Sequence, residues 1–218
     1  MSHPPGLWVT IPVKPLAEGK SRLASTLTGQ ERQALTRQMI QKTLAVVLSV
    51  PGLAGVIVVS RDEEILALAE EVGALALAEK LVEQRNGATS GDKEWGLNQA
   101  VVQAAAFSLH EKGDALLFLP TDLPLLRAEE IQMLVKAWDR RENCVVIAPS
   151  HDGGTNALLL APPDAIAPAF GVESFARHIR LAEEKGLSVA IVESEGLAWD
   201  VDTVTAKGTY KAEKRVEW

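Results

Sequence analysis

The feature that most constrains this fold is an alternation of short apolar runs with longer stretches of helical periodicity. The apolar run at residues 7–13 is followed by residues 30–50, whose apolar side chains recur at intervals of three and four until Pro51-Gly52 ends the pattern. The alternation continues through about two thirds of the chain. It predicts an α/β fold with a mainly parallel sheet flanked by helices.

The same two patterns predict the remaining elements. We expect further strands at 56–60, 74–78, 115–119, 145–148, 157–160 and 189–192. We expect further helices at 62–72, 95–112, 128–141 and 174–185, and a polar excursion loop at 79–93. No linker rich in proline or serine divides the 218 residues, so we expect a single domain over 1–218. Ligands of open α/β sheets bind beyond the carboxyl ends of the strands, so the loops that follow strands are the candidate site.

The loop after the first strand has a composition that suits phosphate groups. Lys14 is followed by Gly19, Lys20, Ser21 and Arg22, which combine cations, a hydroxyl and backbone N–H groups. The spacing of a Walker A loop is absent, and so is Gly-x-Gly-x-x-Gly. From these residues alone, a solvated turn is an equally good interpretation.

Two acidic motifs follow later strands. Asp122 lies between two prolines in Leu-Pro-Thr-Asp-Leu-Pro, and Asp200 and Asp202 point the same way if Asp-Val-Asp is extended. Carboxylates that act together with phosphate oxygens are typical Mg²⁺ ligands. The alternative for Asp122 is a cap on the helix that begins near Arg127.

Two glycine-containing motifs offer polar groups to a ligand. Asp-Gly-Gly-Thr-Asn at 152–156 permits close backbone approach, with Thr155 and Asn156 as polar contacts, or else forms a hairpin turn. Phe-Gly-Val-Glu-Ser at 170–174 places Gly171 and an N-cap Ser174 at a helix N-terminus, where anions bind.

Two more polar side chains lie near helix starts. Gly96 and Asn98 stand close to the start of the helix at 95–112, and the Asn98 amide offers the donor and acceptor that suit a nucleobase edge. We interpret His178, four residues after Ser174, as a surface or capping histidine rather than a catalyst.

Composition narrows the class of function. The formal net charge of −7 argues against non-specific binding to nucleic acid or to an anionic membrane, and no apolar run is long enough to span a bilayer. Residues 1–50 nevertheless hold six Lys or Arg and two Asp or Glu, so the loop with Lys20 lies in a cationic segment. One cysteine and an N-terminus without a signal-peptide pattern favour a cytoplasmic protein.

Taken in order, the motifs resemble the 2-phospho-L-lactate / phosphoenolpyruvate guanylyltransferase family over residues 8–205. The resemblance rests on Ile-Pro-Val-Lys-Pro-Leu-Ala-Glu-Gly-Lys-Ser-Arg-Leu from 11, Gly-Leu-Asn from 96, Leu-Pro-Thr-Asp-Leu-Pro-Leu from 119, Gly-Thr-Asn-Ala-Leu-Leu from 154, Phe-Gly-x-x-Ser-Phe from 170 and Asp-Val-Asp-Thr from 200. It implies a nucleotide-diphospho-sugar-transferase-like (Rossmann-like) fold. It also implies transfer of GMP from GTP to a phosphorylated three-carbon acid, with release of pyrophosphate, in coenzyme F-420 biosynthesis.

The resemblance also implies roles for individual residues. Those implied to hold the triphosphate of GTP are Lys14, Gly19, Lys20, Ser21 and Arg22, and those implied to lie near the guanosine are Gly96 and Asn98. The implied catalytic residues are Lys20, Arg22 and Asp122, and Mg²⁺ would be bound by Asp122 with Asp200 or Asp202. The residues implied for the acid are Thr155, Gly171 and Ser174. The attacking phosphate is already anionic at pH 7, so the reaction needs positioning and charge neutralisation rather than a general base.

Two segments depart from the family pattern. Residues 83–95 form a long, charged approach to Gly-Leu-Asn, and residues 204–218 lack the family's usual continuation and are interpreted as a candidate mobile tail. The competing interpretations are a nucleotidyltransferase for a molybdopterin cofactor or a sugar phosphate, and a non-catalytic nucleotide-binding module. The acceptor among phosphoenolpyruvate, 2-phospho-L-lactate and 3-phosphoglycerate is left open, as is a homo-oligomer.

Overall fold

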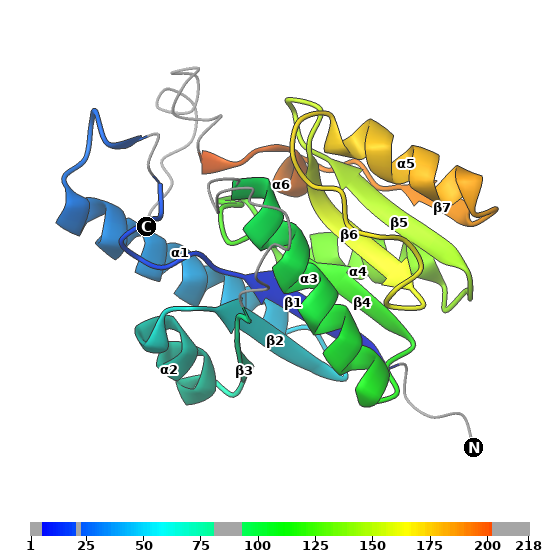
Figure 1. The fold of residues 1–218 in the computed structure, drawn as a ribbon, viewed down its shortest axis with the longest axis horizontal. Coiled ribbons are helices and arrows are strands. Elements are labelled where there is room, and N and C mark those ends of the chain that lie inside the picture. The colour runs from blue at the N-terminus through cyan, green and yellow to red at the C-terminus, as the bar shows by residue number, and fades with distance from the viewer. Residues whose placement is uncertain (1–5, 21–22, 81–92, 202–218) are drawn as a thin grey trace, which may run out of the picture.

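The strands are the apolar runs of the sequence, and they form one sheet in the computed structural model. The model describes residues 6–20, 23–80 and 93–201. In these residues the sheet has seven strands in the order β3-β2-β1-β4-β6-β5-β7 (Figure 1). Their bounds are β1 Leu7–Pro12, β2 Gly55–Ser60, β3 Leu75–Ala78, β4 Ala115–Phe118, β5 Cys144–Pro149, β6 Thr155–Ala161 and β7 Ser188–Ile191. Strand β6 runs antiparallel to β4 and β5, and the other pairs are parallel.

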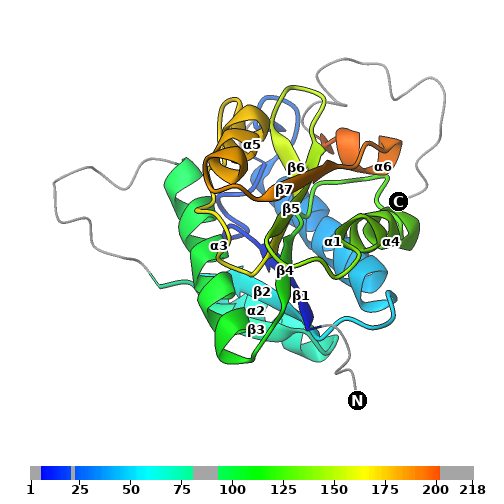
Figure 2. The same cartoon turned by 90° about the vertical axis from the view of Figure 1, so that its right-hand side faces the viewer.

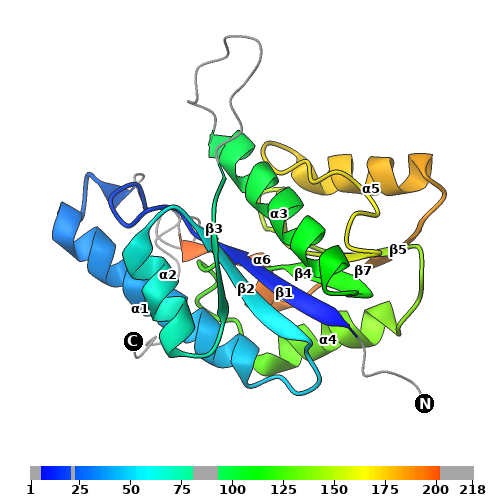
Figure 3. The ribbon, with the colours of Figure 1, turned by 60° about the horizontal axis from the view of Figure 1, so that its bottom comes forward.

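Helices cover both faces of the sheet. Their bounds are α1 Gly29–Leu48, α2 Glu63–Glu71, α3 Lys93–His110, α4 Ala128–Trp138, α5 Ser174–Glu184 and α6 Glu195–Ala198. One core layer joins the sheet to α1, α2, α4 and α6, and a second joins it to α3 and α5. Figure 2 shows α3 and α5 on one side of the strands and α1 and α4 on the other, and Figure 3 shows the same layers from a different direction.

Local sequence signals account for the helix that follows β1. Thr28 and Glu31 form a capping box at the start of α1, with Glu31 N–H donating to Thr28 Oγ1 and Thr28 N–H donating to Glu31 Oε2. A cap of this kind contributes about 1 kcal/mol. The buried face of α1, which includes Ile40, Leu44 and Val47, follows the helical period read from the sequence.

The chain order of the strands creates a crevice beside β1. The chain passes from β1 through α1 to β2 on one side, and it later passes through α3 to β4 on the other side. Loops that follow β1 and β4 therefore diverge at this switch point, where ligands of open α/β sheets bind. Because β6 is antiparallel to β4, with Phe118 opposite Leu158, β6 begins at the edge where β4 ends.

The predicted α/β fold is confirmed, and one helix was missed. Each predicted strand and helix has its counterpart, while α6 is an additional short helix. Several predictions concern residues outside the described ones: these are Ser21, Arg22, Asp202, most of the excursion loop and the tail at 204–218. Among the helices of the described ranges, none is both long and apolar enough to cross a membrane.

Candidate active site

A lysine from the loop after β1 meets an aspartate from the loop after β4 at the switch point. Lys20 Nζ donates to Asp122 Oδ2 over 3.0 Å, and the two side chains are 10% and 31% exposed. The alternative in which Asp122 caps α4 is wrong, because Arg127 is the N-cap residue and its N–H donates to Glu130. The sequence-predicted Lys20 and Asp122 are therefore neighbours in space.

The loop that carries Lys20 is anchored on both sides. Leu16 is buried, and its N–H donates to Asp62 Oδ2, the N-cap carboxylate of α2, over 2.9 Å. Gly19 packs so closely on α1 that a Cβ there would lie 3.0 Å from Thr36 Oγ1. Lys20 itself has a left-handed backbone, with φ 51°. The described part of this loop is therefore held in place by α1 and α2 rather than being a freely solvated turn.

A cluster of charged side chains joins the same loop to the ends of β2 and β3 and to α3. Arg61 pairs with Glu18 at 3.0 Å and with Glu79 at 3.2 Å. Burial raises the pKa of Glu79, against the opposing pull of the Arg61 and Lys14 charges. A Cβ on Gly96 would lie 3.6 Å from Glu79 Oε1. Lys14 and Gly96, which the resemblance assigns to the nucleotide, thus lie around one carboxylate.

Asn98 joins α3 to the segment that leads into Gly171. Phe170 N–H donates to Asn98 Oδ1 over 2.8 Å, and Asn98 Nδ2 donates to the Phe170 carbonyl oxygen over 3.4 Å. Gly171 follows with φ 127°, a conformation that favours glycine. The Asn98 amide thus positions the backbone beside Gly171, and its contact with a nucleobase stays a prediction.

The two hydroxyls assigned to the acid lie together and are buried. Ser174 Oγ donates to Thr155 Oγ1 over 3.1 Å, and the two residues are 2% and 8% exposed. The prediction that Ser174 is an N-cap is wrong, because the N-cap residue is Glu173 and Ser174 is the first residue of α5. Its hydroxyl turns toward β6 instead of the helix N–H groups.

His178 is part of this cluster, and the prediction of a surface histidine is wrong. Its side chain is fully buried; Nδ1 lies 3.1 Å from Thr155 Oγ1, and Nε2 accepts the Ala169 N–H over 2.9 Å. Burial lowers the pKa of His178 to about 4, so the ring is neutral at pH 7. The signal in the sequence was its spacing of four from Ser174, which places both residues on the buried face of α5.

The glycine pair at 153–154 serves the β5–β6 hairpin. Gly153 has φ 84°, and a Cβ on Gly154 would lie 2.7 Å from Ser150 Oγ, so the turn requires both glycines. The hairpin interpretation is confirmed by the antiparallel pairing of β5 with β6. Asn156 Nδ2 donates to the Leu197 carbonyl oxygen over 2.8 Å. Alternation along β6 turns the Asn156 side chain away from Thr155 and toward α6, and its contact with a ligand stays a prediction.

The segment that carries Asp200 runs beside Asp122. Val201 N–H donates to the Asp122 carbonyl oxygen over 3.0 Å. Among residues 6–20, 23–80 and 93–201 no three His, Cys, Asp or Glu side chains gather as a metal cluster. Mg²⁺ commonly takes only one or two carboxylates and completes its coordination with phosphates and water, so a partly exposed Asp122 next to Asp200 fits that ion.

The geometry agrees with the comparison to known protein families. A family model described as guanylyl transferase CofC-like matches residues 7–209. The chain belongs to this family of guanylyltransferases. The resemblance drawn from the sequence motifs is therefore confirmed.

Relatives of this guanylyltransferase are similar over most of their length. A phosphoenolpyruvate guanylyltransferase of Sphaerobacter thermophilus is 39% identical over 88% of this chain and 86% of that protein. A 2-phospho-L-lactate guanylyltransferase of Methanobrevibacter ruminantium is 34% identical over 93% and 83%. A 3-phospho-D-glycerate guanylyltransferase of Colwellia psychrerythraea is 32% identical over 89% and 86%.

Solved structures share the fold at low sequence identity. A protein of Desulfovibrio desulfuricans described as a nucleotide-diphospho-sugar transferase is 16% identical with a TM-score of 0.68, over 96% of this chain and 91% of that one. CMP:2-keto-3-deoxy-manno-octonic acid synthetase is 14% identical with a TM-score of 0.59, over 95% and 97%. The nucleotide-diphospho-sugar-transferase-like fold of the guanylyltransferase is thereby confirmed.

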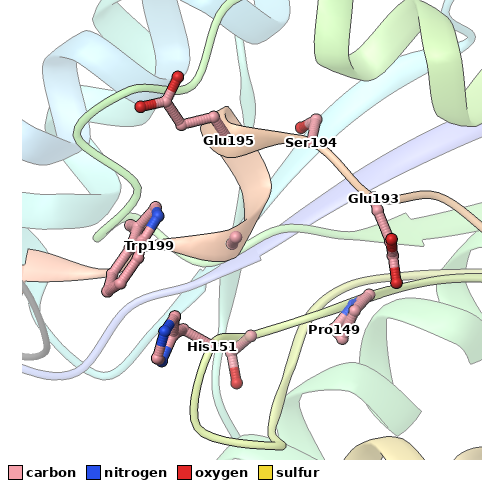
Figure 4. Close-up of a pocket in the computed structure, with 8 residues that line it drawn as sticks. Pro149, His151, Glu193, Ser194, Glu195 and Trp199 are labelled. Carbon is pink, nitrogen blue, oxygen red and sulfur yellow. The ribbon is translucent and has the colours of Figure 1, made fainter.

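A pocket of about 430 Å³ lies beside the Asp200 segment of the guanylyltransferase (Figure 4). The ring of His151 stacks on Trp199 there, with centroids 4.0 Å apart, and His151 N–H donates to the Ala198 carbonyl oxygen. Glu193 and Glu195 also line this pocket. Two carboxylates repel a phosphate, so this pocket does not suit the phosphorylated acid.

Proposed function

We propose that this guanylyltransferase transfers GMP from GTP to the phosphate of a phosphorylated three-carbon acid, as a step in coenzyme F-420 biosynthesis. The acceptor we favour is phosphoenolpyruvate or 2-phospho-L-lactate, because relatives at 34–39% identity carry these names. One observation carries the proposal: Lys20 and Asp122 meet at the switch point of the sheet, on the same edge as the buried Thr155–Ser174 hydroxyl pair.

The reaction joins two anions. A phosphate oxygen of the acid attacks the α-phosphorus of GTP, the bond from that phosphorus to the α–β bridging oxygen breaks, and pyrophosphate leaves with the electron pair. The product is a phosphoanhydride between GMP and the acid. The nucleophile needs no deprotonation at pH 7, so the protein's task is to hold both anions in line and to neutralise their charge.

In our proposal the loop after β1 receives the triphosphate. Lys14 and Lys20 supply cations there, and Gly19 lets the loop pack closely on α1, with its own N–H donating to the Pro15 carbonyl oxygen. Ser21 and Arg22 continue the same loop outside the described residues. Before GTP arrives, Asp122 neutralises Lys20 at 3.0 Å. We propose that the triphosphate becomes the new partner of Lys20, which frees the Asp122 carboxylate.

The freed carboxylate is our proposed site for Mg²⁺. Asp122 and Asp200 would hold the ion, with Asp202 as the further carboxylate that lies outside the described residues. Bound there, Mg²⁺ would supply positive charge to the phosphate oxygens. Pro120 and Pro124 restrict the loop on either side of Asp122, and the Val201 N–H donates to its carbonyl oxygen, so the Asp122 backbone is held before the substrates bind.

The acid would bind on the opposite side of the crevice. Gly171 has a backbone that suits close approach of a ligand, and its carbonyl oxygen accepts the N–H of Ser174, whose hydroxyl donates to Thr155. These neutral donors do not attract the triphosphate as Lys20 does. We therefore propose that the site separates its two anions by placing cations at one and hydroxyl donors at the other.

The test is pyrophosphate release with GTP and Mg²⁺, run in parallel with phosphoenolpyruvate, 2-phospho-L-lactate and 3-phosphoglycerate. We expect release with one acid at a rate at least roughly tenfold above the others, because pocket contacts discriminate acids that differ by a few atoms. If protein that is shown to bind GTP releases no pyrophosphate with any of the three acids, the proposal is contradicted.

A nucleotide panel separates this proposal from its competitors. GTP should exceed ATP, CTP and UTP in the same assay. Turnover with a molybdopterin or sugar-phosphate acceptor in place of the acids would instead support the related nucleotidyltransferases. Tight GTP binding without turnover of any acceptor would support a non-catalytic module.

A further inference from the structure

The hydrogen bonds of His178 fix which of its ring nitrogens carries the proton. Nε2 lies 2.9 Å from the Ala169 amide nitrogen, and a backbone N–H can only donate. Nε2 must therefore be the bare nitrogen of a neutral ring, and Nδ1 must carry the hydrogen. Because Nδ1 lies 3.1 Å from Thr155 Oγ1, the ring donates to the threonine hydroxyl.

This donation determines what the Thr155 hydroxyl can still do. Thr155 Oγ1 accepts from His178 Nδ1–H and also from Ser174 Oγ–H at 3.1 Å, so both of its lone pairs are used. Its own hydrogen is the one hydrogen-bonding capacity that remains. A hydroxyl that accepts two hydrogen bonds is also polarised into a stronger donor.

We propose that His178 is a positioning residue that makes the Thr155 hydroxyl an outward hydrogen-bond donor for the anionic acid substrate. This inference rests on the proposed function, because the acid is the anion assigned to Thr155, Gly171 and Ser174. His178 does not touch the substrate. It acts through Thr155, by donating to the hydroxyl oxygen so that the Thr155 hydrogen is not given to the ring.

The opposite tautomer shows why the direction matters. If Nδ1 were bare, Thr155 would donate its hydrogen to the ring, and Ser174 would donate its hydrogen to Thr155. No hydroxyl hydrogen would then remain for a ligand, and the pair would present only lone pairs, which repel a phosphate or carboxylate. The Ala169 N–H, at the other end of the ring, is what excludes this arrangement.

The surroundings of His178 hold the ring in this state. Its centroid lies 4.9 Å from that of Phe170 in an edge contact, and Phe170 is itself held by Asn98 through two hydrogen bonds. Burial keeps the pKa of His178 near 4, with Arg177 as a smaller cause, so the ring stays neutral at the pH of the reaction. The donor is therefore oriented before the acid binds, as transition-state stabilisation requires.

A direct test reads the tautomer in the unmodified protein. Nitrogen-15 NMR of labelled protein at pH 7 distinguishes protonated from bare ring nitrogens, and a sample of His178→Asn assigns the signal. We expect His178 with a protonated Nδ1 and a bare Nε2. A protonated Nε2, or an imidazolium signal at pH 7, would overturn the inference.

Two matched variants test the consequence for the acid. His178→Asn keeps a donor near the Nδ1 position, while His178→Gln keeps an acceptor near the Nε2 position for the Ala169 N–H. We expect His178→Gln to raise the KM for phosphoenolpyruvate roughly tenfold, with the KM for GTP and kcat within about twofold, because a hydrogen bond to a charged group is weakened. His178→Asn should stay within about threefold of wild type. Equal KM changes in both variants would mean a packing role only, and would overturn the inference.

A double-mutant cycle checks that His178 acts through Thr155. Thr155→Val removes the outward donor, so adding His178→Gln to it should raise the KM for the acid by less than about twofold more. Full additivity would overturn the inference. Titration calorimetry with phosphoenolpyruvate repeats the cycle without turnover. Binding that His178→Gln weakens in the wild-type background but not in the Thr155→Val background supports the inference even if no acid releases pyrophosphate. An absence of pyrophosphate release with this binding pattern would contradict the proposed function and leave the inference standing. Wild-type protein that binds none of the three acids would overturn both.

Discussion

The two sides of the crevice are built from opposite kinds of interaction. On one side Lys20 and Asp122 form an ion pair between two loops, with side chains 10% and 31% exposed. On the other side Thr155, Ser174 and His178 form a neutral network between β6 and α5, at 8%, 2% and 0% exposure. The charged side can exchange its partners when ligands arrive, whereas the neutral side keeps its internal hydrogen bonds and offers one remaining hydroxyl hydrogen.

The difference follows from what it costs to bury each kind of group. An ion pair that is taken fully out of water loses more hydration energy than its attraction returns, so the charged side stays partly open. Hydroxyls and a neutral imidazole are tolerated in the interior when each is hydrogen-bonded. The buried side is therefore suited to recognise the acid through oriented hydrogen bonds, and the partly exposed side is suited to neutralise the charge of phosphates.

The largest expected effect comes from breaking the charged side. Asp122→Asn should lower the rate of pyrophosphate release at least roughly 100-fold, because the site loses the carboxylate that we propose holds Mg²⁺ beside the transferring phosphate. The free energy of unfolding should change by no more than about 1 kcal/mol, since the ion pair is partly exposed. Both quantities are measurable on the same preparation, by a coupled phosphate assay and by urea unfolding.

Asp164→Asn is the matched control for that variant. Asp164 is exposed and follows β6, at the opposite edge of the sheet from Asp122. It should leave both the rate and the unfolding free energy near their wild-type values. A rate for Asp122→Asn within threefold of this control would mean that the charged side is not catalytic.

The buried neutral ring of His178 should make the stability of the fold depend on pH. The folded pKa of His178 is about 4, below its ordinary value of 6.5, so the unfolded chain takes up the proton first as pH falls. The stability contributed by the neutral ring is present above pH 6.5 and is lost progressively from there toward pH 4. Between pH 7 and pH 5 this amounts to about 2 kcal/mol.

Carboxylates also titrate in this range, so the measurement must be a difference. Urea unfolding of wild type and of His178→Asn at pH 7 and pH 5 isolates the histidine, because the variant lacks the titrating ring. We expect the stability advantage of wild type over the variant to shrink by about 2 kcal/mol at the lower pH. A difference that is independent of pH would mean that the ring is not held neutral.

The sequence predicted the charged side of the site better than the neutral side. Lys20 and Asp122 follow apolar strands, and loops after parallel strands converge at one edge, so their meeting follows from the order of elements alone. The strands and helices themselves could be predicted because apolar runs and helical periodicity are local signals in the sequence.

The neutral side depends on which way individual side chains turn, and that is decided by packing. Serine is a typical N-cap residue, but Glu173, with a left-handed backbone, is the N-cap residue of α5, and the Ser174 hydroxyl donates to Thr155. His178 looks like a surface residue until α5 packs on the sheet and buries it. Asn156 sits one residue from Thr155, and only the pleat of β6 sends it to α6.

A third prediction concerns Asn98, which links α3 to the neutral side. Asn98→Ala leaves the Phe170 N–H without its partner, so the unfolding free energy should fall by about 1–2 kcal/mol. The KM for the acid should then rise more than the KM for GTP, because Phe170 adjoins Gly171. Asn98→Asp keeps the oxygen acceptor and should recover most of the stability. A selective rise in the KM for GTP would instead support the nucleobase contact.

The smallest expected effect distinguishes the two hydroxyls of the neutral side. Ser174 Oγ donates to Thr155 Oγ1, so Ser174 stands one bond further from the outward hydrogen. Ser174→Ala removes one neutral hydrogen bond, which corresponds to a roughly fivefold rise in the KM for the acid. Thr155→Val should exceed this in the same assay, because it removes the bond to the charged ligand. If Ser174→Ala had the larger effect, the hydrogen bond between the hydroxyls would run the other way, and Ser174 would face the acid.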